Sequence, residues 1–372
     1  MVKRQVESLF FFFLVTGFLL TNAQAGQPSG KLPQVPAFPK KGIWLNTAAP
    51  LNRQVFKEKL TLVYFWDYAS INCVREIGIL KKWHDLYHPY GLELIGIHSP
   101  EFYFAKDTNN VEKALERLKI FFPVFLDNEY KLWDAYKVQS WPTKFLVDDQ
   151  GRIVHTQVGE GQHLNTEDKI REFLARINPG AILPDPASRA GGEKFSFEQC
   201  GMMSTETYTG YRKSNWWGAS IANRQWVPPD QTVIFKDRGE RVERGFFAQG
   251  LWSTREDYLE HARKTASLTD YLGLVYMAHE VYAVANLAKA KEAAKIYVTR
   301  DESPVPAEQR GIDLQVDENG GTYFVIGEPR LYYLIANEDP EPHELKLWTQ
   351  SPGVGIHSFS FSNRCLSDFE HL

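Results

Sequence analysis

The residues whose types and spacing could do chemistry lie between Tyr64 and Val74, which read YFWDYASINCV. An apolar run ends at Trp66, a short turn follows, and a single cysteine, Cys73, stands in the expected first turn of a helix. Two cysteines separated by two residues can cycle between dithiol and disulfide, because one thiolate attacks and the other releases the mixed disulfide. Here Ser70 stands where the first cysteine of such a pair would be. The releasing step therefore has no local partner.

The surroundings of Cys73 allow two interpretations. The N-terminal partial charge of a helix favours a thiolate, the Ser70 hydroxyl could donate a hydrogen bond to the sulfur, and Arg75 could add positive charge. Against this, Glu76 would oppose ionisation, and the second cysteine of such a motif is usually shielded. A reactive thiol and an inert thiol both stay open.

A hydroxyl three residues before a lone cysteine also resembles the Thr-x-x-Cys of peroxiredoxins, whose sulfur attacks peroxide and becomes a sulfenic acid. That family carries a proline four residues before its threonine, and Trp66 stands there in this sequence. A peroxiredoxin-like thiol peroxidase or sulfenate sensor is therefore the weaker alternative.

The elements around this segment predict an α/β domain with a central mixed sheet and helices on both faces. Leu60 to Trp66 and Leu92 to Ile97 are apolar runs typical of buried strands, and Asn72 to Tyr87 has apolar residues at helical spacing. Further along we expect a helix at 110–119, a short strand at 123–126, a helix at 129–136, a β-hairpin from 144–147 and 152–158, and a helix at 166–177.

The C-terminal half has a different pattern, in which short alternating apolar runs are separated by turn residues. Such spacing predicts an all-β sandwich or jelly roll. The predicted strands lie at 233–236, 245–251, 272–277, 280–287, 295–299, 312–316, 321–326, 331–335, 344–348 and 355–362. Glu256 to Lys264 is expected to form one short helix between strands.

Length and composition fit two domains, since the chain has 372 residues of which 43% are hydrophobic. We expect a linker at 26–40, the α/β domain at 41–180, a second linker at 181–194 and the β-domain at 195–372. The formal net charge of −4 argues against nucleic acid as a partner, because phosphate binding needs a strongly basic face.

The N-terminus has the three parts of a secretory signal peptide. Lys3 and Arg4 precede an apolar block from Leu9 to Leu20, and the small-x-small sequence Ala23-Gln24-Ala25 follows. We expect residues 1–25 to be cleaved and the protein to be exported to the periplasm or the cell exterior. The alternative is a retained membrane anchor, although the apolar block is short for a bilayer span.

Export changes how the three cysteines are interpreted, because thiols outside the cytoplasm tend to be oxidised. Cys200 and Cys365 lie near the two ends of the predicted β-domain, where first and last strands are often neighbours. We predict that they form a disulfide, which would stabilise the fold by roughly 5 kcal/mol if unstrained. The alternative is two separate buried thiols.

These residues carry a resemblance to a known family. The segment FWDYASINCVREIGILKKWHDLY resembles the redox-helix region of the TlpA and DipZ-type extracytoplasmic thioredoxin-like proteins. The match continues through GIHSPEF, PVFLDNEYKLWDAY and WPTKFLVDDQGRIVHTQVGEG. Beyond the predicted boundary, TETYTGYR, EPRLYYLI and HELKLWTQSPGVGIHSFSF resemble the carbohydrate-binding-module-like β-sandwich of DipZ-type proteins. The resemblance implies a thioredoxin-like fold, thiol–disulfide exchange and no cofactor.

Carried over position by position, the resemblance assigns roles to five residues. Cys73 takes the place of the second, more buried cysteine, and Ser70 takes the place of the attacking one. Pro142 matches the cis-proline loop that faces the thiols, and Glu76 matches a glutamate near them. Gly78 stands where the family usually has a proline. The implied partners are exported protein thiols or disulfides, with a membrane or periplasmic thiol reductant.

Pro142 follows Trp141, and an X-Pro bond can take the cis form at low cost. The alternative is an ordinary trans proline at the end of a strand, and the family resemblance favours the cis form. A cis-proline loop presents open backbone groups, so it could bind an extended peptide without any redox step. Trp66, Trp141 and Pro142 are the predicted substrate-binding residues.

The histidines give a weaker indication of a functional site than the thiol segment does. His84 and His88 are four residues apart on one helix, which is compatible with metal binding. No third ligand lies within sequence reach and Pro89 ends the helix, so we predict a solvated face and no metal site. His98, at a carboxyl end of the sheet, is more often structural than ligand-binding at such a position.

Four tryptophans of the second half could form a stacking platform for a glycan, or they could fill the β-domain core. Core burial is the favoured interpretation, because aromatic side chains dominate such interiors. The four residues are Trp216, Trp217, Trp226 and Trp252.

Three functions of different classes therefore remain. The first is a divergent thiol–disulfide oxidoreductase that acts through Cys73. The second is a redox-inactive module that binds a peptide or a glycan. The third is a peroxide-reducing or sulfenate-forming thiol.

Overall fold

The computed structural model describes residues 32–190, 203–217, 220–223, 227–242, 244–289 and 292–363. Residues 33–372 form one compact unit. The predicted signal segment, Cys200 and Cys365 lie outside the described residues, so the signal peptide and the disulfide remain predictions. Among the described helices, none is both long and apolar enough to cross a membrane.

The first domain is built on a six-stranded mixed sheet with the strand order β1-β4-β3-β2-β5-β6. Strands β2, β3 and β4 are parallel, whereas β5, β6 and β1 each run antiparallel to their neighbours. The strands are β1 (Trp44–Leu45), β2 (Leu60–Trp66), β3 (Leu92–His98), β4 (Val124–Leu126), β5 (Thr143–Val147) and β6 (Ile153–Val158). Every residue of β2 is buried, as expected for a central parallel strand covered on both faces.

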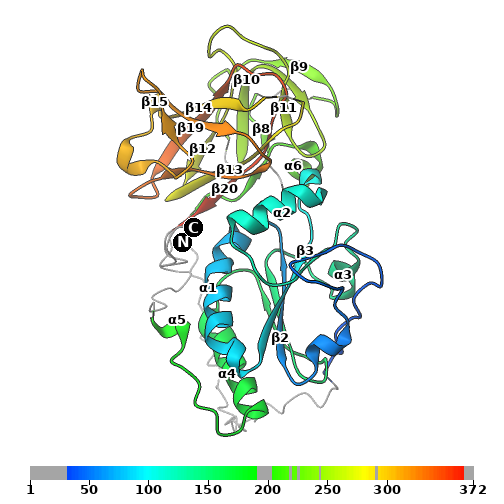
Figure 1. Ribbon diagram of the computed structural model, residues 1–372. Helices are drawn as coiled ribbons and strands as arrows, with labels where there is room; N and C mark the ends of the chain where they lie inside the picture. The colour runs from blue at the N-terminus through cyan, green and yellow to red at the C-terminus, as the bar shows by residue number, and fades with distance from the viewer. Residues whose placement is uncertain are drawn as a thin grey trace, which may run out of the picture. The chain divides into compact units, whose positions relative to one another are not determined.

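Helices cover both faces of this sheet, which confirms the predicted architecture. Helices α1 (Ile71–Tyr87) and α4 (His163–Ile177) run side by side across one face (Figure 1). Side chains of α2 (Thr108–Arg117) join the same apolar core. On the other face, α3 (Lys131–Ala135) and a 3-10 turn at Arg53–Phe56 pack on a second core.

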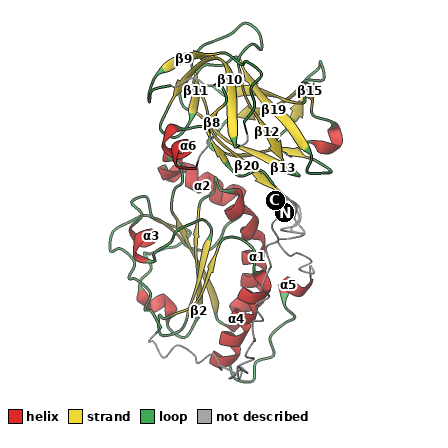
Figure 2. Ribbon diagram, turned by 180° about the vertical axis from the view of Figure 1, so that it is seen from behind, coloured by secondary structure: helices red, strands yellow, loops and turns green. Residues whose placement is uncertain are grey.

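The C-terminal domain is all-β, as predicted, and its strands surround one apolar core (Figure 2). One layer contains β9, β11, β20, β13 and β18, the other contains β12, β19, β14, β17 and β16, and β10 pairs into both. The strands are β7 (Thr207–Tyr208), β8 (Ser220–Ile221), β9 (Thr232–Phe235), β10 (Gly245–Thr254), β11 (Leu259–His261), β12 (Tyr271–Met277), β13 (Glu280–Leu287), β14 (Ala294–Arg300), β15 (Ser303–Pro304), β16 (Gln315–Val316), β17 (Thr322–Ile326), β18 (Arg330–Ala336), β19 (Pro342–Thr349) and β20 (Val354–Ser362).

One predicted element of this domain is wrong. The segment Glu256 to Lys264 contains strand β11 instead of a helix, because its backbone pairs with β10 on one side and β20 on the other. Tertiary pairing has overridden a weak local pattern. The structure also has a short helix that the sequence did not suggest, α6 (Tyr211–Trp217).

Both predicted linkers contain residues that pack against the first domain. Val35 and Phe38, in the segment 26–40, are buried in the core beneath α3. In the segment 181–194, a short helix α5 (Ala187–Ala190) begins with backbone N–H groups that donate to the Glu167 carboxylate at 2.7 Å. The domain boundaries themselves stay predictions.

Candidate functional site

The thiol loop, residues 67–73, connects the end of β2 to the first turn of α1. Ser70 is the N-cap of the helix, with φ −94° and ψ 118°, and its carbonyl accepts from the backbone N–H of Cys73 at 3.1 Å. The Tyr64 hydroxyl, from β2, donates to the Cys73 carbonyl at 2.8 Å. Strand, turn and helix thus hold Cys73 where the sequence predicted it.

The Cys73 side chain is fully buried, with 0% of its surface exposed. Burial raises the pKa of its thiol far above the ordinary value of 9.0. Hydrogen bonds from the Asp67 backbone and the Ser70 hydroxyl favour the thiolate, but they do not outweigh burial. The negative charges of Asp67 and Glu101 raise the pKa of Cys73 further. In this conformation the sulfur is therefore a protonated, shielded thiol.

Arg75 does not supply the positive charge that the sequence suggested. Its guanidinium makes a bidentate pair with Glu160, at 2.9 and 2.7 Å, and also donates to Asn72 at 2.8 Å. The prediction that Arg75 would favour a Cys73 thiolate is wrong, because this guanidinium is engaged by a carboxylate from another part of the fold.

Glu76 lies at the centre of a buried charge cluster beneath the thiol loop. Its carboxylate forms an ion pair with Lys144 of β5, and it also accepts from His163 Nε2 at 2.9 Å and from the Gly161 backbone N–H at 2.6 Å. Burial alone would raise the pKa of Glu76, but the Lys144 cation and the His163 ring lower it to about 2. The glutamate is therefore ionised and compensated by its own partners.

Sequence reasoning missed Lys144 and His163. A signal was present, because Lys144 is the one charged residue in an otherwise apolar strand, and a buried lysine requires a counter-charge. The partner could not be named from the sequence, since Glu76 is remote from Lys144 along the chain.

A second buried cluster joins the thiol loop to the C-terminal domain. The carboxylate of Asp67 accepts from the backbone N–H of Ala69 at 2.6 Å and from that of Glu101. Burial and the Glu101 charge raise the pKa of Asp67 to about 7. Glu101 in turn forms an ion pair with Lys213 of α6 and accepts from the Tyr208 hydroxyl of β7 at 2.7 Å.

Glu206 adds another carboxyl group to this cluster. Its side chain accepts from the Ser360 hydroxyl at 2.9 Å and lies 2.8 Å from the Tyr208 hydroxyl oxygen, whose single proton is shared between Glu206 and Glu101. Burial, followed by the charge of Glu101, raises the pKa of Glu206 to about 7. Residues of the C-terminal domain thus complete the surroundings of the thiol loop.

The Trp141–Pro142 peptide bond is cis, as predicted. Phe65 pairs with Thr143 across β2 and β5, so Pro142 lies beside the end of β2 from which the thiol loop departs. The half-buried Trp141 ring donates to the Ser99 carbonyl at 2.9 Å, and Lys213 Nζ lies 5.6 Å from that ring.

Trp66 is placed differently from its predicted role in substrate binding. The side chain is fully buried, stacked 6.3 Å from Tyr64 and edge-on to His98 at 5.4 Å. It offers no exposed surface to a substrate, so its placement does not support that prediction. His98 is equally buried, and burial lowers its pKa to about 3. Both residues act as core.

Trp252 fills the core of the C-terminal domain, where its ring is 1% exposed and its Nε1 donates to the Gln249 carbonyl at 2.9 Å. This placement agrees with the core interpretation for Trp252. The side chains of Trp216 and Trp217, and all of Trp226, lie outside the described residues.

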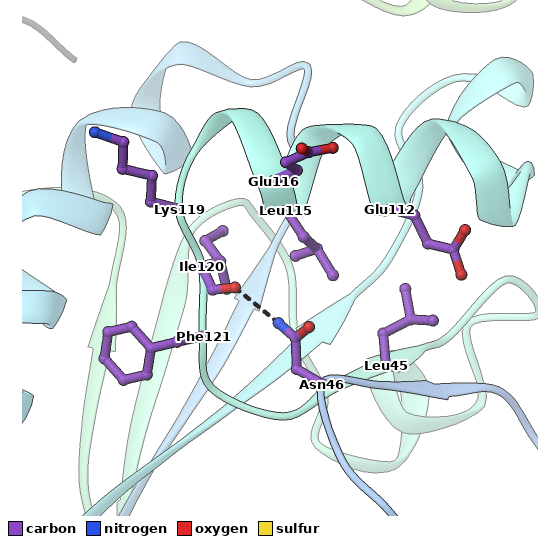
Figure 3. A pocket seen from close by; sticks show the side chains of 8 residues that line it. All are labelled: Leu45, Asn46, Glu112, Leu115, Glu116, Lys119, Ile120 and Phe121. Atoms are coloured by element: carbon purple, nitrogen blue, oxygen red, sulfur yellow. Dashed lines mark hydrogen bonds between the residues drawn. The ribbon is translucent and has the colours of Figure 1, made fainter.

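A surface pocket of 490 Å³ lies between the end of β1 and the C-terminal part of α2 (Figure 3). Asn46 closes one side of it by donating to the Ile120 carbonyl at 2.8 Å. Its lining residues are Leu45, Asn46, Glu112, Leu115, Glu116, Lys119, Ile120 and Phe121. None of the predicted site residues is among them, so this pocket is separate from the thiol loop.

Comparison with known proteins agrees with this architecture. Residues 34–156 match the AhpC/TSA family, and residues 204–362 match the thioredoxin-like C-terminal domain family. Protein DipZ of Mycobacterium bovis is 29% identical over 327 residues, covering 87% of this chain. Over most of its length the chain is therefore similar to DipZ. It spans 42% of the length of that relative.

Further relatives match the first domain. The thiol-disulfide oxidoreductase ResA of Geobacillus thermodenitrificans is 27% identical over 124 residues, which is 33% of this chain and 66% of ResA. The crystal structure of a thiol-disulfide isomerase from Corynebacterium glutamicum has a TM-score of 0.34 and 20% identity, covering 38% of this chain and 97% of that one.

Proposed function

We propose that this protein carries out thiol–disulfide exchange on exported protein substrates through its single site thiol, Cys73. The observation that carries the proposal is the position of Cys73 in the first turn of α1, just after the N-cap residue Ser70. The names of relatives such as ResA and YkuV support the same reaction class, since both are thiol-disulfide oxidoreductases.

The exchange would begin when Cys73 loses its proton and its sulfur attacks one sulfur of a substrate disulfide. The substrate S–S bond breaks, a mixed disulfide forms, and the released substrate sulfur leaves as a thiolate that takes up a proton. A thiolate of a dithiol reductant in the periplasm or membrane then attacks the substrate sulfur of the mixed disulfide, so Cys73 leaves as a thiolate and a reductant–substrate disulfide forms. The second thiol of the reductant resolves that bond, which releases the reduced substrate and leaves the reductant as a disulfide. Ser70 would stabilise the attacking sulfur, and Asp67, whose pKa is about 7, is a suitable proton acceptor.

Reaction requires that the buried sulfur be uncovered. The thiol loop is held down partly by the C-terminal domain, through the Lys213 and Tyr208 contacts to Glu101. Substrate access would therefore involve movement of the thiol loop, of these contacts or of both. Slow exchange that accelerates at alkaline pH is the expected behaviour of such a thiol.

A second candidate is a redox-inactive module that binds an extended peptide at the Trp141–Pro142 loop. The full burial and the raised pKa of Cys73 favour it. The same two observations disfavour peroxide reduction, because the thiolate is the species that attacks peroxide.

Export and a thiol reductant as partner are parts of the same proposal, whereas a glycan at the C-terminal domain belongs to the binding-module alternative. Export is supported by the pattern of residues 1–25, with its basic start and apolar block. A reductant is required by the chemistry, because Cys73 is the only cysteine among the described residues and none of them offers a second thiol to resolve its mixed disulfide.

Reduction of insulin by the mature chain, with dithiothreitol as the electron source, tests the proposal. We expect the wild-type rate to exceed that of Cys73→Ala, and the variant to retain the wild-type far-UV spectrum. Equal rates for the two proteins would leave the binding module as the remaining candidate.

A further inference from the structure

Two histidines and a glutamate meet where α1 turns into β3. His88 caps α1 and opens a short 3-10 turn, and Gly91, with φ 100°, reverses the chain into the strand. This path brings Glu93 back to His88, with 3.6 Å between Nδ1 and Oε1. The sequence prediction found no third ligand within reach, because it did not foresee the reversal at Gly91.

The three side chains already form a compact group. The rings of His84 and His88 are stacked, with centroids 4.5 Å apart and an angle of 22° between their planes. One ligand atom from each of the three residues lies within 4.8 Å of the others. His84 also contacts the Phe121 ring at 4.6 Å, which limits its movement. A shared ion would lie about 2 Å from each of the three atoms, so the side chains would rotate to bind it.

We propose that His84, His88 and Glu93 form a binding site for Zn²⁺, with water as the fourth ligand. Two imidazoles and a carboxylate are a donor set that zinc takes in tetrahedral sites with one open position. His88 Nδ1 lies 3.2 Å from the Leu92 carbonyl oxygen. In the tautomer whose Nδ1–H donates to this carbonyl, Nε2 is the nitrogen left to bind a metal, and such a backbone acceptor is the usual outer partner of a metal-binding histidine.

Charged side chains around the site affect how strongly it would bind a metal ion. Asp85 lies 3.9 Å from His84 Nδ1 and adds negative charge. Lys59 forms an ion pair with Glu93 and therefore competes with the metal for that carboxylate.

Calorimetric titration of the metal-free full chain with ZnCl₂ at neutral pH tests the proposal. We expect His84→Ala and His88→Ala each to lose one bound equivalent of zinc, because the affinity for Zn²⁺ should fall at least about 100-fold. Removing a group that only hydrogen-bonds to a metal ligand already lowers metal affinity by roughly 10–100-fold. Glu93→Gln should weaken binding, and Lys59→Met should tighten it several-fold by freeing the carboxylate. Co²⁺ in place of Zn²⁺ should give the visible absorption of a tetrahedral site.

Matched controls are His155→Ala, a half-buried histidine on β6, and Lys57→Met, an exposed lysine two residues from Lys59. Both should bind zinc like the wild type. The proposal is overturned if the metal-free chain binds no zinc, or if both histidine variants keep the wild-type number of equivalents. An unchanged affinity in Lys59→Met would likewise exclude Glu93 as a ligand.

Discussion

Removing the charge of Glu76 should be among the most destabilising single changes at this site. In Glu76→Gln the side chain keeps its volume, but Lys144 is left as an uncompensated buried cation and His163 loses a charged acceptor. The relevant side chains are almost fully buried, with 2% of Glu76 and 1% of Lys144 exposed. Breaking a buried ion pair from one side costs about 3–5 kcal/mol.

The lowered pKa of Glu76 gives a second value for the free energy that this ion pair contributes to folding. Its fall from the ordinary value of 4.5 to about 2 corresponds to about 3 kcal/mol of folding free energy at neutral pH. Because the folded pKa is the lower one, this stabilisation is present above pH 4.5 and is lost as the pH falls toward 2. The difference in unfolding free energy between the wild type and Glu76→Gln should therefore be largest near pH 7 and should become smaller at acidic pH.

Urea unfolding of the full chain, followed by circular dichroism, measures this free energy. Glu76→Gln should lower it by about 3 kcal/mol at pH 7, and the double variant Glu76→Gln, Lys144→Met should regain part of the loss. The control is Glu58→Gln, whose exposed partner Lys57 is 3.8 Å away, so its effect should stay below about 0.5 kcal/mol. A loss below about 1 kcal/mol in Glu76→Gln would refute the argument that this pair is buried and coupled.

Two further predictions concern the thiol loop. Because the folded pKa of Asp67 is raised to about 7, its ionised carboxylate opposes folding, and the free energy of unfolding should fall as the pH rises from about 4 to 7. In a pH series of urea unfolding curves, Asp67→Asn should weaken this pH dependence. An unchanged dependence of the unfolding free energy on pH in Asp67→Asn would contradict the raised pKa of Asp67. Ser70→Cys should restore dithiol activity in insulin reduction if the scaffold is intact, whereas a folded but inactive variant would show that Ser70 is not the decisive departure.

The fold was largely predictable because its signals are local. Strands β2 and β3 are mostly apolar, α1 has apolar residues at helical spacing, and strands of the C-terminal domain such as β17 alternate between buried and half-buried residues. The failed prediction, a helix at 256–264, fell on a segment whose structure is decided by pairing with β10 and β20. The local sequence pattern does not show which strands will pair with a segment in the folded protein.

The sequence predicted where the thiol loop lies, but not how deeply Cys73 is buried or which charged groups surround it. Trp141–Pro142 and the Ser70–Cys73 spacing placed the thiol loop correctly, whereas the burial of Cys73 depends on packing that the sequence does not display. The partners that set its electrostatics, such as Lys144 and Lys213, come from strands and helices remote in sequence. Their contacts exist only after the chain has folded.

Trapping a mixed disulfide on Cys73 of the native chain is the most direct test of the proposed exchange. The protein would be incubated with a small peptide disulfide across a pH series, quenched in acid and mapped by peptide mass spectrometry. We predict a peptide adduct on Cys73 that forms slowly near pH 7 and faster as the pH rises, as a thiol with a raised pKa requires. A folded protein whose Cys73 acquires no adduct at any pH would contradict exchange through this thiol.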